Sequence, residues 1–331
     1  MARKNKSAAR RLLKGLFALP LAIASGWIVY SKFFVDHDVP LKDAIVAQRV
    51  VYTAKTAVNL NYYVNKRGNG RPLVLIHSIN AAASAYEMGP LFTQYQDQRP
   101  VYALDLPGYG FSDRPNRVYS PQYFAESILD FLETQVKEPA DVVALSLSCE
   151  FVARAALAEP ELFNSLALIS PTGFTQKDQG RSQRAASTYK SQQIYKTLSN
   201  PLWGQALYDL IVTRPSLSFF LKKSFVGEIT SGMIGYAYST SHQTGAKNVP
   251  LYFVSGALFT PDIRTRFYEK IIAPTLVIYD RDGFSRFDTL PILLQNNANW
   301  SQARIVPSLG LPQFERLQAT AVALDTFWAN N

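Results

Sequence analysis

Hydrophobic residues follow two patterns along the chain, and these patterns alternate. Short runs that are apolar except for one end residue, such as residues 72–77, 101–105 and 141–145, are typical of strands buried on both faces of a sheet. Residues 121–136 instead carry apolar positions at helical spacing. Strands that alternate with helices predict an α/β fold with a doubly wound, mostly parallel sheet.

Further strands are expected on both sides of these runs. Two early strands are predicted at 50–53 and 60–64, and later ones at 165–170, 273–279 and 303–306. The body of the chain is therefore expected to be one domain over residues 49–331. With 331 residues, 47% of them hydrophobic, the chain is long enough and apolar enough to bury a large core.

The N-terminal part of the chain has a different composition. Residues 1–14 form a basic arm, and residues 15–31 carry no charge. As a helix, this uncharged run measures about 25 Å, slightly less than a ~30 Å hydrocarbon core, and Phe33 to Val35 extend it. We expect a transmembrane or signal-anchor helix over residues 15–35, followed by a linker over 36–48.

The basic arm predicts the orientation of this anchor. By the positive-inside rule the N-terminus is cytoplasmic and the main domain lies on the opposite side of the membrane. A cleaved signal peptide is the alternative, because Ala22-Ile23-Ala24 is typical of a processing site.

Charge and cysteine content exclude several classes of function. The net charge is +9, but six basic residues lie in the arm, which leaves 28 basic against 25 acidic residues elsewhere. No basic stripe interleaved with aromatics is present, so no nucleic-acid partner is expected. The only cysteine, Cys149, excludes an intrachain disulfide. We expect neither a metal nor a cofactor.

One serine lies where a strand is followed at once by a helix. Residues 141–153 combine a β-branched strand, an abrupt turn at Ser146 and a helix, which is the layout of a nucleophile elbow. The usual G-x-S-x-G occurs here as residues 144–148, Ala-Leu-Ser-Leu-Ser. Small residues satisfy the steric requirement of the turn. A buried strand followed by an ordinary helix gives the same pattern, so the motif needs support from the rest of the chain.

That support comes from the order of four motifs. The segment Leu75 to Ser78, the loop Asp105 to Ser112, the elbow, and the strand 273–279 followed by Asp282 resemble the α/β-hydrolase superfamily. The similarity is to its branch of lidded esterases and epoxide hydrolases, and it covers about residues 50–330. It implies an inserted helical lid over about residues 173–270.

The resemblance also implies roles for individual residues. Ser146 is the expected nucleophile and Asp282 the expected acid, although Asp280 is an alternative for the acid. Backbone amides of Leu147 and of the segment after His77 are expected to form the oxyanion hole. In that segment the candidates are Ser78 and Ile79. His77 itself belongs to this loop and is expected to be structural.

The base of the triad is missing from its expected position. The family order is Ser, Asp, His, with the histidine in a Gly-His-x-Pro…Glu pattern after the last strand. Aligned to this pattern, residues 307–315 place Gly310 at the histidine position, and no histidine follows His242. His242, inside the expected lid, is the candidate substitute base, and Glu315 is a possible weak base near the lost position.

Three hypotheses follow. The first is a membrane-tethered hydrolase-fold protein that binds a lipophilic ligand or a partner, with little or no conventional hydrolysis. The second is a serine esterase, lipase or acyltransferase that acts on an acyl ester through Ser146, Asp282 and a displaced base. The third is a structural component of a membrane complex. We favour the first, because removing the base of a serine triad costs about six orders of magnitude in turnover.

Overall fold

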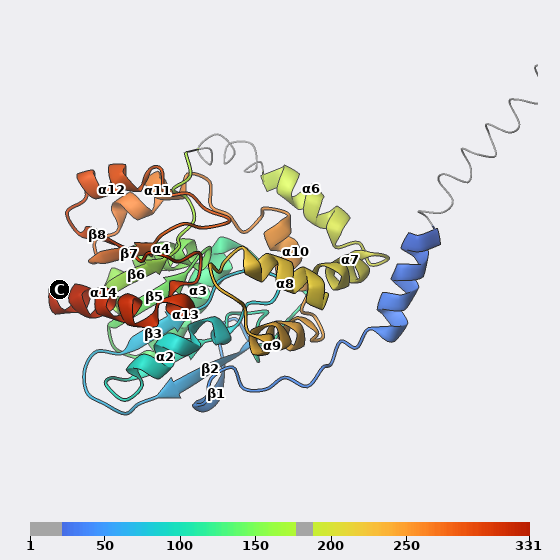
Figure 1. The fold of residues 1–331 in the computed structure, drawn as a ribbon, viewed down its shortest axis with the longest axis horizontal. Helices are drawn as coiled ribbons and strands as arrows, with labels where there is room; N and C mark the ends of the chain where they lie inside the picture. The colour runs from blue at the N-terminus through green and yellow to red at the C-terminus, as the bar shows by residue number, and fades with distance from the viewer. Residues whose placement is uncertain (1–21, 177–187) are drawn as a thin grey trace, which may run out of the picture.

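The centre of the molecule is an eight-stranded, mostly parallel sheet (Figure 1). The computed structural model describes residues 22–176 and 188–331. The strand order is β1-β2-β4-β3-β5-β6-β7-β8; β2 is antiparallel to β1 and β4, and the other neighbours are parallel. The strands are β1 (Gln48–Thr53), β2 (Asn59–Asn65), β3 (Leu73–Ile76), β4 (Val101–Leu104), β5 (Ala140–Leu145), β6 (Phe163–Ile169), β7 (Thr275–Tyr279) and β8 (Trp300–Arg304). The α/β class predicted from the pattern is confirmed.

The last strand begins earlier than the sequence predicted. The apolar pattern placed it at 303–306, whereas β8 starts at Trp300. Ser301 and Gln302 are exposed on this edge strand, so their polarity conceals the strand from an analysis of hydrophobic runs. Trp300 is buried, and its place in the register is opposite Thr275 of β7.

Alternate strand residues point to opposite sides of the sheet. Since residues on both sides are apolar, helices cover both faces. Leu73 and Leu75 face one hydrophobic layer, while Val74 and Ile76 face the other. The first layer contains α2 (Gly89–Tyr95) and α14 (Leu317–Ala329), and the second contains α3 (Pro121–Phe131), α4 (Ser148–Ala158) and α12 (Leu290–Asn296). Shorter helical turns are η1 (Ala85–Met88), η2 (Leu132–Val136), η3 (Pro160–Leu162), α11 (Ile263–Arg266), η4 (Tyr268–Lys270) and α13 (Pro312–Glu315).

The loop after β4 is built around one buried carboxylate. Asp105 accepts hydrogen bonds from the Asn61 side chain (2.7 Å) and from the backbone N–H groups of Ala85 (2.8 Å) and Phe111 (3.0 Å). Gly110 has φ +51°, and a Cβ at this position would lie 2.0 Å from the carboxyl carbon of Asp105. The close approach of the loop to Asp105 therefore requires glycine, which explains the motif.

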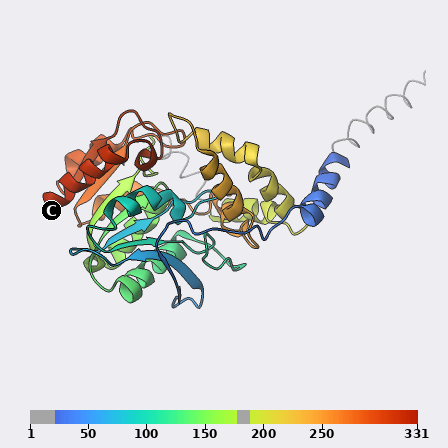
Figure 2. The same ribbon diagram turned by 60° about the horizontal axis from the view of Figure 1, so that its bottom comes forward.

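A group of helices lies between β6 and β7 in the chain and beyond one end of the sheet (Figures 1 and 2). We call residues 188–254 the α6–α10 segment. Its helices are α6 (Thr188–Leu198), α7 (Gly204–Ile211), α8 (Arg214–Lys222), α9 (Ser231–Ser241) and α10 (Asn248–Val254). Tyr208, Val212 and Leu217 form a small core of its own with residues of α9. The segment occupies the place of the lid expected over 173–270, and its role as a lid stays a prediction.

An N-terminal helix over residues 22–34 lies against α7 (Figure 1). Trp27 Nε1 donates to the Ala206 carbonyl (2.7 Å), and Ser31 Oγ donates to the Asp209 carboxylate (2.5 Å). His37 Nε2 lies 3.0 Å from both carboxylate oxygens of Asp209. Asp209 is buried and also accepts from Gln205, so it joins the N-terminal helix to the α6–α10 segment.

The described part of the chain contains no helix long and apolar enough to span a bilayer. The anchor expected over 15–35 lies partly outside the described residues, which begin at residue 22. The predicted anchor, its orientation and the basic arm over 1–14 therefore remain predictions.

The Asp209 contact is testable by substitution. Asp209→Ala removes the acceptor shared by Ser31 and His37, and leaving buried donors unpaired costs about 1–3 kcal/mol. We expect faster hydrogen–deuterium exchange over residues 22–37 in this variant. Asp38→Ala, an exposed acid in the same segment, is the matched control. Identical exchange in wild type and Asp209→Ala would contradict the coupling.

Candidate active site

Ser146 lies in a strained turn between β5 and α4. Its φ is +55°, a conformation that costs energy for a residue with a side chain. Its N–H donates to the Ile169 carbonyl of β6 (2.8 Å), so the sheet pairing holds the turn. β5 ends at Leu145 and α4 begins at Ser148, which leaves only two residues for the reversal. The strand-turn-helix geometry is that of a nucleophile elbow, and it leaves Ser146 half-buried.

Small residues flank the turn where glycines are usual. Ala144 and Ser148 are both fully buried. The Cys149 thiol contacts the Ala144 carbonyl (3.3 Å), and burial raises the pKa of this thiol. Cys149 is therefore an apolar packing residue beneath the elbow, and no disulfide partner exists for it in the sequence.

The amides predicted to form the oxyanion hole differ in whether they are already hydrogen-bonded. The N–H groups of Leu147 and Ile79 take part in no hydrogen bond among the described residues. The Ser78 N–H, in contrast, donates to the Glu87 carboxylate (2.8 Å). The expectation that Ser78 supplies an oxyanion donor is therefore corrected, because Glu87 already binds this amide. Leu147 and Ile79 remain as candidates.

His77 has a structural environment. Its Nε2 accepts the Leu106 N–H (2.9 Å), so the ring proton is on Nδ1, which donates to the Ser78 carbonyl (2.6 Å). The residue is fully buried, and this burial lowers the pKa of the imidazole. A neutral ring with both nitrogens bound to backbone groups fits the expected structural role.

The two aspartates after β7 have different partners. Asp280 is buried, pairs with Arg304 (2.9 Å) and accepts the Ser308 N–H (3.1 Å). Asp282 accepts two backbone N–H groups on Oδ1, from Phe284 (2.6 Å) and Ser285 (3.2 Å). Burial raises the pKa of Asp282. Asp280 is thus committed to β8 and its loop, which leaves Asp282 as the candidate acid.

Gly310 lies beside the second oxygen of Asp282. A Cβ built on Gly310 would be 3.4 Å from Asp282 Oδ2 and 3.5 Å from Ser224 Oγ. The nearest heavy atom to this position is 3.4 Å away, which is an ordinary van der Waals contact, so a Cβ fits here. The parallel strands β5, β7 and β8 end at one edge of the sheet, and this edge carries the elbow, the Asp282 loop and the Gly310 loop.

Comparison with known proteins agrees with this architecture. A family model described as alpha/beta hydrolase fold matches residues 71–282. The chain belongs to the α/β-hydrolase fold family. A 2-(acetamidomethylene)succinate hydrolase of Mesorhizobium japonicum is 27% identical over 115 residues, which are 35% of this chain and 41% of that protein. The alignment thus spans about two fifths of the length of this curated relative.

Solved structures resemble the chain over more of its length. A serine hydrolase involved in carbazole degradation has a TM-score of 0.67 at 16% identity, covering 86% of this chain and all of that one. A membrane phospholipase A, a bacterial virulence factor, has a TM-score of 0.64 at 18% identity, covering 97% of this chain and 98% of its own. At these identities the likeness concerns the fold.

His242 lies at the C-terminal end of α9 in this α/β-hydrolase fold. Its ring stacks on Tyr238 with centroids 3.8 Å apart, and its Nδ1 lies 2.8 Å from the Tyr238 carbonyl. Burial lowers the pKa of the ring. Among the described residues, His242 shares no hydrogen bond with Ser146 or Asp282. His242, the predicted substitute base, therefore does not reach the elbow through a hydrogen bond in the described part of the chain.

Glu315, the other possible base, binds backbone groups. One carboxylate oxygen accepts the N–H groups of Val226 (2.6 Å) and Gly227 (3.1 Å), and the other accepts the Leu309 N–H (2.9 Å). Glu315 therefore connects the chain between α8 and α9 to the loop that carries Gly310. Its lone pairs are used in holding these two segments together.

The sequence analysis missed Glu150 on the first turn of α4. It is buried, and it accepts hydrogen bonds from the Thr172 hydroxyl and the Thr260 N–H (2.7 Å). Burial raises the pKa of Glu150 from 4.5 to about 7. It joins the elbow helix to the loop after β6 and to the chain leading out of α10. A carboxylate flanked by Cys149 and Phe151 within an apolar helix was the available signal.

Glu150 predicts how stability depends on pH. The folded state holds a proton that the unfolded chain releases near pH 4.5, so the contribution of Glu150 to stability is greatest below that pH and is lost as pH rises to about 7. The loss amounts to roughly 3 kcal/mol, at about 1.4 kcal/mol per pKa unit. Urea unfolding at pH 5 and pH 8 measures it, and Glu150→Gln should flatten the dependence. An equal pH dependence in both proteins would exclude Glu150 as its source.

Proposed function

We propose that this chain is a membrane-tethered α/β-hydrolase-fold protein with an incomplete triad. It binds a lipophilic ligand or a partner and carries out little or no conventional hydrolysis. The observation that carries the proposal is Gly310 beside Oδ2 of Asp282, where a Cβ would be 3.4 Å from that oxygen. This is the place from which a histidine side chain would reach the acid.

The chemistry explains why this single position matters. In a serine triad the imidazole accepts the hydroxyl proton on one nitrogen and donates from the other to the acid. Glycine can do neither. Loss of the base removes about six orders of magnitude in turnover, or roughly 8 kcal/mol of barrier lowering. Binding through the elbow, the amides of Leu147 and Ile79 and the surrounding side chains does not depend on that base.

The ligand is proposed to be lipophilic because of the α6–α10 segment, which we propose acts as a lid. Aromatic side chains are frequent in it, among them Tyr195, Trp203, Phe219 and Phe220. Tyr195 stacks on Tyr252 of α10 at 3.7 Å. The similarly folded membrane phospholipase A makes phospholipids the first ligands to test.

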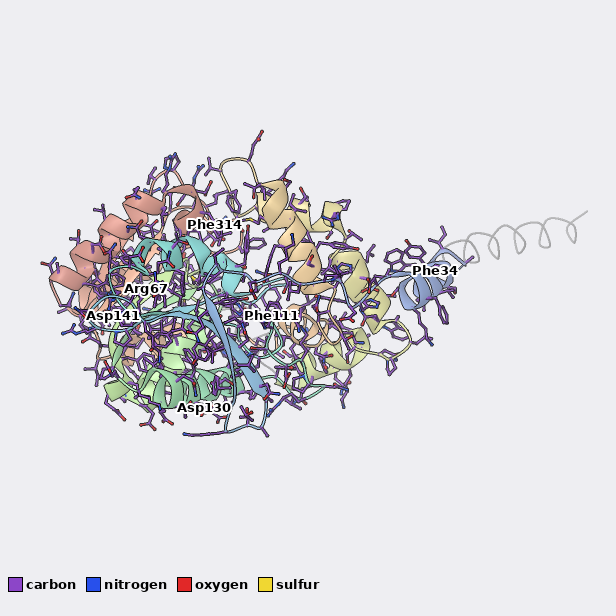
Figure 3. The ribbon with its side chains drawn as sticks, turned by 90° about the horizontal axis from the view of Figure 1, so that it is seen from below. Phe34, Arg67, Phe111, Asp130, Asp141 and Phe314 are labelled. Atoms are coloured by element: carbon purple, nitrogen blue, oxygen red, sulfur yellow. The ribbon has the colours of Figure 1, made fainter. Side chains whose placement is uncertain are left out.

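Membrane tethering is supported by an apolar surface on the N-terminal helix and its neighbours. Phe33 and Phe34 are 69% and 71% exposed, and Figure 3 shows Phe34 on the N-terminal helix at one end of the molecule. Exposed apolar side chains of this kind mark contact with lipid or protein. Others on the helix and on or beside α7 and α8 are Ile23, Val29, Tyr30, Leu202, Trp203, Leu210, Phe219 and Phe220. Exposed lysines (Lys32, Lys222 and Lys223) lie among them and suit anionic headgroups.

A second candidate is a serine hydrolase or acyltransferase with a displaced base. The positive φ of Ser146 favours it, because a strained serine at an elbow is characteristic of nucleophiles. The amides of Leu147 and Ile79, which take part in no hydrogen bond within the described ranges, point the same way. For His242 to serve as the base, it would have to leave its stacked position on Tyr238.

Restoring the base tests the main proposal. Wild type should hydrolyse p-nitrophenyl esters slowly and react slowly with a fluorophosphonate. Gly310→His should raise kcat/KM by about 10²-fold or more, because a positioned general base contributes about 10²–10⁴-fold. The double variant Gly310→His, Ser146→Ala should lose the gain.

A reactive Ser146 in wild type would contradict the main proposal. Rapid fluorophosphonate labelling of wild type that disappears in Ser146→Ala would favour the serine hydrolase. In that case His242→Ala identifies whether the displaced histidine is the base, since activity should fall with it. Gly310→Ala controls for filling the position without adding a base.

Membrane contact is tested by flotation of the full chain with liposomes that contain anionic phospholipid. Phe33→Ser with Phe34→Ser should reduce the bound fraction, because two exposed aromatic rings no longer insert into the lipid. Val322→Ser, an exposed apolar residue on α14, is the matched control. If the paired variant and the control float to the same extent as wild type, residues 33 and 34 do not contact lipid.

A further inference from the structure

The Asp282 carboxylate is bound on one side only. Its Oδ1 accepts two backbone N–H groups from its own loop, at 2.6 and 3.2 Å. Its Oδ2 takes part in no hydrogen bond among the described residues, and this oxygen lies 3.4 Å from the position that a Cβ on Gly310 would take. A half-buried carboxylate is therefore left with one unpaired acceptor.

Nearby cations do not neutralise Asp282. Arg304 pairs with Asp280 instead (2.9 Å). The Lys223 ammonium lies over the Phe219 ring, 4.5 Å from its centroid. Within the described ranges Asp282 forms no ion pair, and burial raises its pKa. The oxygen that faces Gly310 is thus suited to an N–H donor from outside the chain.

Three segments of the chain lie beside Asp282 Oδ2 and Gly310. Ser224, after α8, places its Oγ 3.5 Å from the Cβ position of Gly310, and this hydroxyl has no hydrogen-bond partner among the described residues. Lys223 contacts the Asp282 loop so closely that a Cβ on Gly283 would lie 2.6 Å from the Lys223 carbonyl oxygen. Glu315 ties the chain after Ser224 to the Gly310 loop. These contacts therefore hold the Asp282 loop, the Gly310 loop and the chain around Ser224 in fixed positions.

We infer that Asp282, Ser224 and the backbone at Gly310 form a subsite for a small aromatic nitrogen base of the imidazole type. Such a base donates an N–H to Asp282 Oδ2 and keeps a lone pair on its other ring nitrogen. The inference rests on the proposed function, in which residue 310 supplies no base. A ligand or substrate that carries such a ring would complete the triad itself.

The chemistry balances with the base supplied from solution. The lone-pair nitrogen takes the Ser146 hydroxyl proton while Oγ bonds to the ester carbonyl carbon. The resulting imidazolium passes that proton to the leaving oxygen as the carbon–oxygen bond breaks, which releases the alcohol. Water then adds to the acyl-serine by the same proton route, releasing the acid and restoring the serine and the neutral base.

The test is hydrolysis of p-nitrophenyl butyrate by the full chain at rising imidazole concentration. We expect a saturable rate increase on the order of 10²-fold, as for a positioned general base. Ser146→Ala should show only the linear background of free imidazole. Asp282→Asn should require more imidazole for half-saturation, because the ring N–H then meets a neutral amide oxygen.

Two further measurements separate occupancy from folding. Gly310→Val fills the position with a branched side chain and should abolish the saturable term while keeping its thermal unfolding transition. Methylguanidinium, which offers N–H donors without a lone pair, should compete with imidazole and give no rate increase. Calorimetric titration of imidazole into Ser146→Ala should still detect binding, since this variant keeps Asp282 and Gly310.

The outcomes distinguish the subsite from the proposed function. If Gly310→His is active but imidazole gives only a linear increase, the subsite is refuted and the missing-base proposal stands. If wild type without imidazole is as fast as Gly310→His, the missing-base proposal fails. Saturable rescue that is unchanged in Gly310→Val would place the bound imidazole elsewhere and would also overturn the subsite.

Discussion

Backbone pairing between parallel strands continues to the last residue before each loop of the site. The Ser146 N–H binds the Ile169 carbonyl, the Ser170 N–H binds the Ile278 carbonyl, and the Ile305 N–H binds the Tyr279 carbonyl. This ladder runs from the elbow across β6 and β7 to β8. The loops of the nucleophile, the acid and residue 310 are thus positioned by main-chain atoms, which do not depend on side-chain identity. Replacement of a histidine by glycine can leave the frame unchanged.

This main-chain pairing also separates ligand binding from turnover, two properties that are usually studied together in hydrolases. In the proposed function, binding depends on the sheet edge, the α6–α10 segment and the amides of Leu147 and Ile79, whereas turnover needs one proton acceptor at one position. In this chain Asp282 keeps its two backbone donors although no imidazole follows. Asp209 links the N-terminal helix to α7, so the region proposed to meet the membrane is continuous with the helices beside the site.

Sequence patterns predicted the features that depend on neighbours in the chain. Uninterrupted apolar runs located the buried strands, and the strand-to-helix switch located Ser146. Contacts between distant segments were not predictable in this way. The Glu87 carboxylate that binds the Ser78 amide comes from a helical turn nine residues away, and the Asp209 contact joins segments separated by more than 170 residues. Glu150 was missed because its donors, on two separate loops, leave no periodic signal.

The lone thiol beneath the elbow has a practical consequence. Cys149 is the only cysteine in the sequence, and it is fully buried on the first turn of α4. A thiol reagent can modify it only when the core around it opens. The modification rate of the unaltered chain therefore reports how often this part of the core opens, and its ratio to the rate of an exposed thiol converts into a local opening free energy. The Cys149 thiol is thus a native probe of local opening, three residues from Ser146.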